Sequence, residues 1–162
     1  MEIFYFNDNN IIECGIDEAG RGPLLGNVYA AAYGIRTHWH SHNWFKNNFD
    51  MEIISIEMKD EKLYHLDCVM FPITDEKTVV ATSVLERKDI KVLEKYTEIV
   101  DIHKEHVYNG WTNAVRIGKK ILHASDPSDK EIESFYGKLG FESVPVLLNE
   151  FDKSGADLSC LV

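Results

Sequence analysis

Cysteine and basic residues are scarce in this 162-residue sequence, and long apolar runs are absent. Its three cysteines, Cys14, Cys68 and Cys160, lie far apart without a C-x-x-C pair, which argues against a disulfide framework and a cysteine-based zinc site. The 17 basic residues are outnumbered by 27 acidic ones, and the net charge of −10 disfavours broad binding to nucleic-acid phosphates. No apolar run approaches the ~20 residues of a membrane span, and no signal-peptide pattern is visible. We therefore expect an acidic, cytoplasmic chain without a membrane partner.

A repeated order of strand, strand, helix and strand is present along the chain. One unit has predicted strands at 68–73, 78–83 and 98–102 and a predicted helix at 87–96. The next unit has predicted strands at 113–118, 119–124 and 141–148 and a helix at 127–139, with Asp126 as its expected N-cap. Corresponding strands are about 46 residues apart, a period typical of repeated architectures whose units cannot bury their faces alone.

The flanking segments predict further strands. Runs at 11–16, 26–33 and 51–57 have strand patterns, and a helix is expected near 41–49. A last apolar run at 158–162 predicts a strand without a following partner. Because an unpaired strand edge can template pairing with another chain, we expect self-association or marginal stability.

The segment Cys14–Gly26, with the sequence CGIDEAGRGPLLG, resembles the opening motif of ribonuclease HII. The resemblance covers about residues 11–32 and implies a β-hairpin in which Asp17 and Glu18 bind Mg²⁺ or Mn²⁺. Hard carboxylate oxygens suit these ions, and two such ions can support phosphoryl displacement. The family's two further acidic ligands have no match in this sequence. Nucleic acid is therefore an expected partner only if this motif is the functional part.

Four later segments carry a second resemblance: YGIRT at 33–37, LYHLDC at 63–68, NGWTNAVRIG at 109–118 and KSGADLSC at 153–160. Their order resembles that in amidinotransferases and dimethylarginine dimethylaminohydrolases, the guanidino-modifying α/β-propeller enzymes. The resemblance implies a partial five-bladed propeller of the pentein type, no cofactor, and a small arginine derivative as substrate. The family's first half, with other substrate-binding carboxylates, has no counterpart here.

The second resemblance implies a role for five residues. Cys160 would be the nucleophile, and His65 would be the general acid and base. Arg36 would clamp a substrate carboxylate, and Asp67 and Asn113 would also bind substrate. From the residues alone, each position also fits a structural role: a buried thiol, a half-buried histidine, a solvated cation, a surface ion pair and a turn or cap residue, respectively.

Taken together, the sequence predicts an α/β fold with a hairpin segment at 1–32 and a partial propeller at 33–162. The expected function is attack on an arginine-derived guanidinium by an amidinotransferase or a dimethylargininase-like hydrolase. Two alternatives stay open: a metal-dependent ribonuclease acting on RNA–DNA hybrids, and a non-catalytic fusion remnant.

Overall fold

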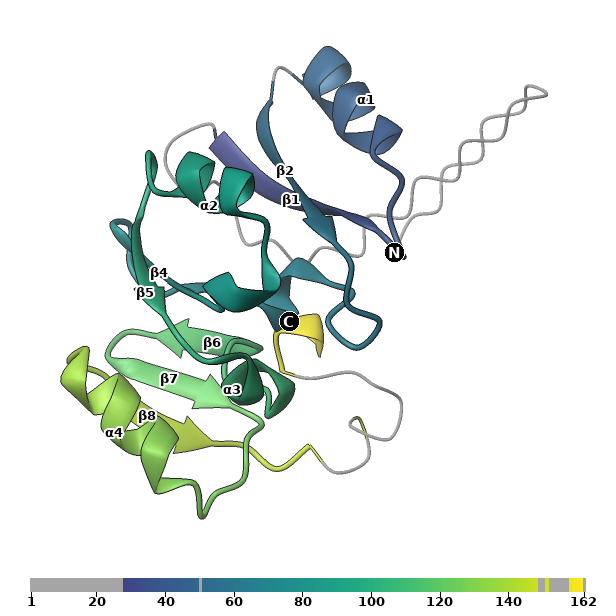
Figure 1. The fold of residues 1–162 in the computed structure, drawn as a ribbon. Helices are drawn as coiled ribbons and strands as arrows, with labels where there is room; N and C mark the ends of the chain where they lie inside the picture. Colours follow the sequence, from purple (N-terminus) through teal and green to yellow (C-terminus); the bar gives the residue numbers. More distant parts are fainter. Residues whose placement is uncertain (1–27, 50, 149–150, 152–157, 162) are drawn as a thin grey trace.

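The first sheet of the computed structural model is a parallel pair. The structure describes residues 28–49, 51–148, 151 and 158–161 (Figure 1). Strand β1 (Val28–Gly34) pairs with β2 (Glu52–Met58) over seven residues, and helix α1 (His40–Phe49) connects them. A parallel pair requires such a crossover, because the chain must return to the end of the sheet at which the first strand began.

Two three-stranded sheets follow, and both have the same topology. The second sheet contains β3 (Met70–Pro72), β4 (Lys77–Val80) and β5 (Glu98–Asp101), with α2 (Arg87–Leu93) before its last strand. The third contains β6 (Ala114–Ile117), β7 (Lys120–His123) and β8 (Glu142–Pro145), with α4 (Lys130–Lys138) before its last strand. In each sheet the first pair is antiparallel and the second is parallel. The predicted strand–strand–helix–strand repeat is therefore confirmed.

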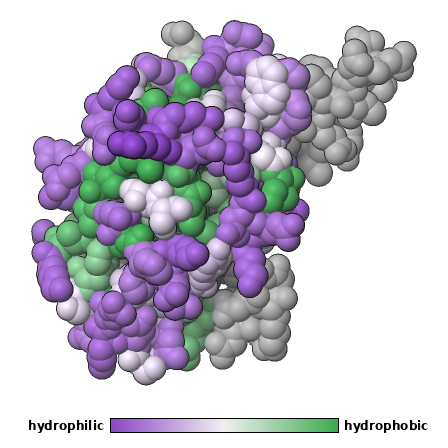
Figure 2. All heavy atoms as spheres, in the orientation of Figure 1, coloured by the Kyte–Doolittle hydropathy of each residue, from purple (hydrophilic) through white to green (hydrophobic). Residues whose placement is uncertain are grey.

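All three sheets contribute to one hydrophobic core. Ile56 of β2, Val80 of β4 and Ile121 of β7 have no exposed surface, and they belong to the same buried cluster. Figure 2 shows apolar residues gathered over the middle of the visible face, with hydrophilic residues around them. Because each sheet alone would leave an apolar face in water, burial of these faces against one another holds the repeats together.

The described sheets are open, and none of them closes on itself (Figure 1). The structure therefore supports a mixed α/β fold with repeated sheets, which is coarser than the predicted five-bladed propeller. The predicted boundary between residues 32 and 33 falls inside β1. The first strand of the predicted hairpin, at 11–16, lies outside the described residues, as do Asp17 and Glu18.

Two local predictions were wrong. The expected strand at 158–162 is instead a 3-10 turn, η3 (Ser159–Leu161). The N-cap of α4 is Asp129, whose carboxylate accepts the backbone N–H groups of Glu131 at 2.9 Å and Ile132 at 3.3 Å. Asp126 accepts the backbone and hydroxyl donors of Ser128, so its carboxylate stabilises the preceding turn rather than the helix.

Three short elements lie between the strands and longer helices. The 3-10 turn η1 (Leu66–Cys68) precedes the second sheet, η2 (Thr82–Val84) lies between β4 and α2, and helix α3 (Lys104–Tyr108) lies between the second and third sheets. The N-cap of α3 is His103, which accepts the backbone N–H of Glu105 at 3.4 Å. Among the helices that the structure describes, none has the length and apolar character that a membrane span requires.

Two histidines are buried between strands and helices. Burial, the largest cause, lowers the pKa of His42, whose Nδ1 lies 2.8 Å from the Ser55 hydroxyl and whose Nε2 lies 3.0 Å from the Ala32 carbonyl. Burial also lowers the pKa of His123, which is 1% exposed and lies 2.7 Å from the Ser143 hydroxyl. Since a carbonyl accepts, the neutral form of His42 protonated on Nε2 satisfies both of its contacts.

We expect the free energy of unfolding to fall as the pH drops below about 6.5, the ordinary histidine pKa. The unfolded chain takes up protons there while buried His42 and His123 resist them, so acid favours the unfolded state. Urea unfolding between pH 8 and pH 5 measures the slope. His123→Gln should flatten the slope, and its stability at pH 8 gives the separate packing cost. An unchanged slope in this variant would contradict the prediction for His123.

Candidate active site

His65 lies at the start of the second repeat, where the chain leaves β2 and enters η1. It is the N-cap residue of η1 and is 8% exposed. The Tyr64 ring meets the His65 ring edge to face, with centroids 4.6 Å apart. The guanidinium of Arg36 lies over the same Tyr64 ring, 4.8 Å from its centroid. Two of the predicted site residues are thus connected through Tyr64.

Three turns that are distant in sequence meet beside His65. The Ser159 hydroxyl donates to Oδ2 of Asp67 at 2.6 Å, and the Ser159 backbone N–H donates to Oδ1 of Asn113 at 2.7 Å. The Asn113 amide donates to the same Asp67 oxygen at 3.2 Å. Asn113 and Ser159 are buried, and Asp67 is half-buried. These bonds bring together the segments that begin the second and third repeats and the segment that contains Cys160.

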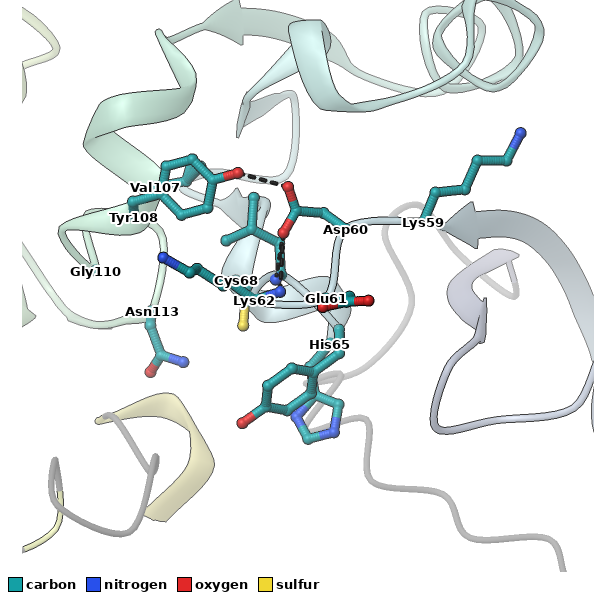
Figure 3. Close-up of a pocket in the computed structure, with 12 residues that line it drawn as sticks. Lys59, Asp60, Glu61, Lys62, His65, Cys68, Val107, Tyr108, Gly110 and Asn113 are labelled. Carbon is teal, nitrogen blue, oxygen red and sulfur yellow. Dashed lines mark hydrogen bonds between the residues drawn. The ribbon is translucent and has the colours of Figure 1, made fainter.

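A cavity of about 800 Å³ opens beside these turns (Figure 3). Charged and aromatic side chains dominate its wall, and the lining residues are Lys59, Asp60, Glu61, Lys62, Leu63, Tyr64, His65, Cys68, Val107, Tyr108, Gly110 and Asn113. The mixture of carboxylates and ammonium groups suits a small ligand that carries both signs of charge.

Asp60 holds a fixed negative charge in the wall of this cavity. Its carboxylate accepts the Tyr108 hydroxyl and the backbone N–H groups of Lys62 at 2.8 Å and Leu63 at 3.3 Å (Figure 3). The hydrogen bond from Tyr108, the largest cause, and the two backbone bonds lower the pKa of Asp60, while partial burial opposes them. Because hydrogen bonds to a carboxylate favour its charged form, Asp60 remains available to attract a cation at neutral pH.

The structure brings together three predicted site residues: His65 and Asn113 line the cavity, and Asp67 is hydrogen-bonded to Asn113. Cys160 follows Ser159 directly in η3. The exposed Arg36 reaches the group through Tyr64. The roles of all five residues stay predictions.

Sequence reasoning missed Ser159 and Asp60. Equal spacing could have identified Ser159, since it follows Asn113 by the same 46 residues that separate Asn113 from Asp67. Asp60 carries no sequence signal, because its role depends on Tyr108 from another repeat.

Within the described ranges, no group of three or more histidine, cysteine, aspartate or glutamate side chains is arranged to hold a metal ion. In the cavity wall, the carboxylates of Asp60 and Glu61 lie among the ammonium groups of Lys59 and Lys62. Asp17 and Glu18, the predicted metal ligands, lie outside the described residues.

Comparisons with ribonuclease HII give mostly short matches. The enzyme from Janthinobacterium sp. is 62% identical over 32 residues, which is 20% of this chain and 15% of that protein. A longer match, to the enzyme from Clostridium tetani, is 26% identical and covers 83% of this chain and 58% of that protein. Neither match combines high identity with coverage of most of the relative.

Guanidino-modifying proteins match most of the chain in both sequence and structure comparisons. The N(G),N(G)-dimethylarginine dimethylaminohydrolase of Mycobacterium tuberculosis is 26% identical over 150 residues, which cover 87% of this chain and 47% of that protein. The crystal structure of the N-terminal domain of ArgZ, a cyanobacterial arginine dihydrolase bound to product, superposes with a TM-score of 0.74 at 24% identity. That superposition covers 84% of this chain and 50% of the ArgZ chain, so this chain spans about half the length of both relatives.

The family model that matches covers the core of the described structure. It is the model for eukaryotic N,N dimethylarginine dimethylhydrolase, and it matches residues 26–146, from the start of β1 to the end of β8. Arg36, His65, Asp67 and Asn113 lie inside this match, and Cys160 follows it. The mixed α/β repeats agree with the superposed fold. Because the family model matches more than half of the chain, the chain belongs to the dimethylarginine dimethylhydrolase family of guanidino-modifying proteins.

Proposed function

We propose that this chain hydrolyses a small arginine derivative through a covalent bond to Cys160. The observation that carries the proposal is the hydrogen bond by which Ser159, the neighbour of Cys160, contacts Asp67, two residues after His65. Nucleophile and acid–base catalyst are thereby proposed to share one site, although they are far apart in sequence. The family membership supports the guanidino chemistry, and this chemistry uses no metal cofactor.

In the first half of the proposed reaction, the Cys160 thiolate attacks the guanidinium carbon and forms a carbon–sulfur bond. His65 then donates a proton to the leaving nitrogen, and the carbon–nitrogen bond breaks to release an amine. In the second half, His65 takes a proton from water as the water oxygen attacks the same carbon. The carbon–sulfur bond breaks, which releases a ureido product and restores the thiolate.

Charges around the cavity support a substrate with a cationic guanidinium and an anionic carboxylate. Asp60 and Glu61 line the cavity beside Lys59 and Lys62, so the wall offers carboxylates to the guanidinium and ammonium groups to the carboxylate. A bound guanidinium would in turn favour the thiolate form of Cys160. We propose that Arg36, held over Tyr64, clamps the substrate carboxylate and that Asp67 and Asn113 bind or orient the guanidino end.

We also propose that the open sheets are consecutive blades of a five-bladed propeller of the pentein type. The chain spans about half the length of the relatives described above, so the whole enzyme's activity and partners are part of this proposal. Self-association is proposed because large apolar side chains, among them Phe49, Ile117 and Leu147, are more than half exposed. A cytoplasmic location remains a prediction.

A haloacetamidine reagent tests the nucleophile, because its cationic amidine mimics a guanidinium and its halide is displaced by a thiolate. We expect it to alkylate Cys160 at least about tenfold faster than Cys14 or Cys68, and we expect His65→Ala to slow the reaction at Cys160 about tenfold. Peptide mass spectrometry of timed samples measures all three rates. Equal labelling of the three cysteines in the folded protein would rule out the catalytic assignment.

A second candidate function is metal-dependent cleavage of RNA–DNA hybrids. It is favoured by the 62% identity to a ribonuclease HII over 32 residues. It is also favoured by the motif at Cys14–Gly26, in which Asp17 and Glu18 would bind Mg²⁺ or Mn²⁺. A gel assay of the wild type beside Asp17→Asn tests it with both ions. Cleavage that the variant loses would make the N-terminal motif the functional part.

A further inference from the structure

The residues Asp67, Asn113 and Ser159 lie at equal spacing along the chain. Asn113 follows Asp67 by 46 residues, and Ser159 follows Asp67 by 92. Asp67 lies in η1 before β3, Asn113 lies directly before β6, and Ser159 begins η3. The second repeat, the third repeat and the segment that contains Cys160 therefore each contribute one polar side chain to a common point, which we call the three-turn clamp.

Within the clamp, Ser159 makes contacts with both of the other turns. Its hydroxyl lies 2.6 Å from Oδ2 of Asp67 and 2.8 Å from Oδ1 of Asn113, while its backbone N–H donates to that same Asn113 oxygen at 2.7 Å. A hydroxyl has one proton to donate, and both neighbours are oxygens that accept. The bond to charged Asp67 is the shorter one, and charge-assisted bonds are the stronger class.

A second contact holds two of the turns together. The Thr112 hydroxyl donates to the Cys68 carbonyl at 2.6 Å, and Thr112 is 1% exposed. The turn at 112–113 therefore holds the turn at 67–68 both through Thr112 and through the bond from Asn113 to Asp67. Ser159 adds the third turn to a pair that is already fixed.

We propose that Ser159 is a positioning residue for the reaction, because it fixes the turn that contains Cys160 against the His65–Cys68 segment. This inference rests on the proposed function of Cys160 and His65. A thiol must approach the guanidinium carbon in a defined geometry, and a displacement of about 1 Å at a reacting group can cost about 100-fold in rate. Ser159 acts through the backbone of its neighbour, so its loss affects how Cys160 meets a cationic ligand.

Paired reagents separate this role from general support of the fold. Chloroacetamidine is cationic and resembles a guanidinium, whereas chloroacetamide is neutral and of nearly the same size. Loosening of the turn alone changes the alkylation rates of Cys160 by both reagents together. Loss of positioning lowers the rate ratio of amidine to amide, because this ratio reports the site's recognition of the cation.

We expect Ser159→Ala to lower the amidine-to-amide ratio at Cys160 about tenfold, the effect of losing one hydrogen bond to a charged group. Ser159→Thr keeps a hydroxyl and should restore most of the ratio. Ser143→Ala removes a hydroxyl that contacts His123 instead, and it serves as the matched control with an unchanged ratio.

Two results would overturn the inference, and they differ. A wild-type ratio near that of a small free thiol would defeat the proposed function and this inference with it. A high wild-type ratio that Ser159→Ala leaves unchanged would defeat the positioning role alone and leave the function of Cys160 intact.

Discussion

Replacing Trp111 by alanine is expected to lower the free energy of unfolding by about 3–5 kcal/mol. Trp111 is 1% exposed, and its ring stacks on His106 with centroids 3.9 Å apart. Its indole N–H donates to Asp129 at 3.0 Å, and its carbonyl accepts the buried Tyr136 hydroxyl at 2.7 Å. Removing the ring leaves a large cavity and an unpaired acceptor at the N-terminus of α4.

Two further variants separate the contributions to this loss. Trp111→Phe keeps an aromatic ring but loses the bond to Asp129, so we expect a smaller cost of about 1–2 kcal/mol. Trp44→Ala, on the 41% exposed Trp44 of α1, should cost less than about 1 kcal/mol. Urea unfolding followed by far-ultraviolet circular dichroism measures all three. A loss below about 1 kcal/mol for Trp111→Ala would contradict the packing described here.

Gly34→Ala is expected to destabilise the first sheet by about 3 kcal/mol or more. Gly34 ends β1 with φ of 141°, and a Cβ there would lie 2.3 Å from the backbone oxygen of Met58. Strain at such a φ alone costs about 1–3 kcal/mol, and the opposing atom belongs to paired backbone of β2 that cannot move aside cheaply. The substitution would also displace the turn that leads to Arg36.

Two other glycines provide controls of graded severity. Gly118 has φ of 61° and open space where a Cβ would lie, so Gly118→Ala measures the cost of backbone strain alone, about 1 kcal/mol. Gly137 lies in α4 with nothing near a Cβ, so Gly137→Ala should stabilise the helix by about 0.5–1 kcal/mol. The order of the three unfolding midpoints tests the prediction. A Gly34→Ala midpoint equal to that of Gly118→Ala would show that the Met58 backbone yields.

Sequence periodicity predicted the repeats because each repeat must bury its own apolar strands. Val80 and Ile121 are fully buried in the middle strands of successive sheets, and the sequence pattern of both segments predicted a strand. Periodicity failed at 158–162, where an apolar run forms η3 instead of a strand. The difference lies in Ser159, whose backbone N–H bonds to a side chain of Asn113 rather than to a neighbouring strand.

Local patterns also left a choice between nearby candidates. Asp126 and Asp129 both precede α4, and an aspartate at either place is a good N-cap. Tertiary packing decides between them, since the other oxygen of Asp129 accepts the indole N–H of Trp111. In the site, His65, Asp67 and Asn113 were indicated by motif order, whereas the cavity lined by His65 and Asn113 also depends on Tyr108, which motif order did not indicate.

The span of the three-turn clamp has a consequence for the order of folding. The bond between Ser159 and Asp67 joins residues 92 positions apart, and both the second and third sheets lie within that loop. Because closing a long loop costs entropy before its contacts form, we expect this contact to form after local hairpins such as β6–β7. By the same logic, the turn at Ser159 can open while the sheets stay folded. After denaturation, recovery of the amidine-to-amide alkylation ratio at Cys160 should therefore lag behind recovery of secondary structure.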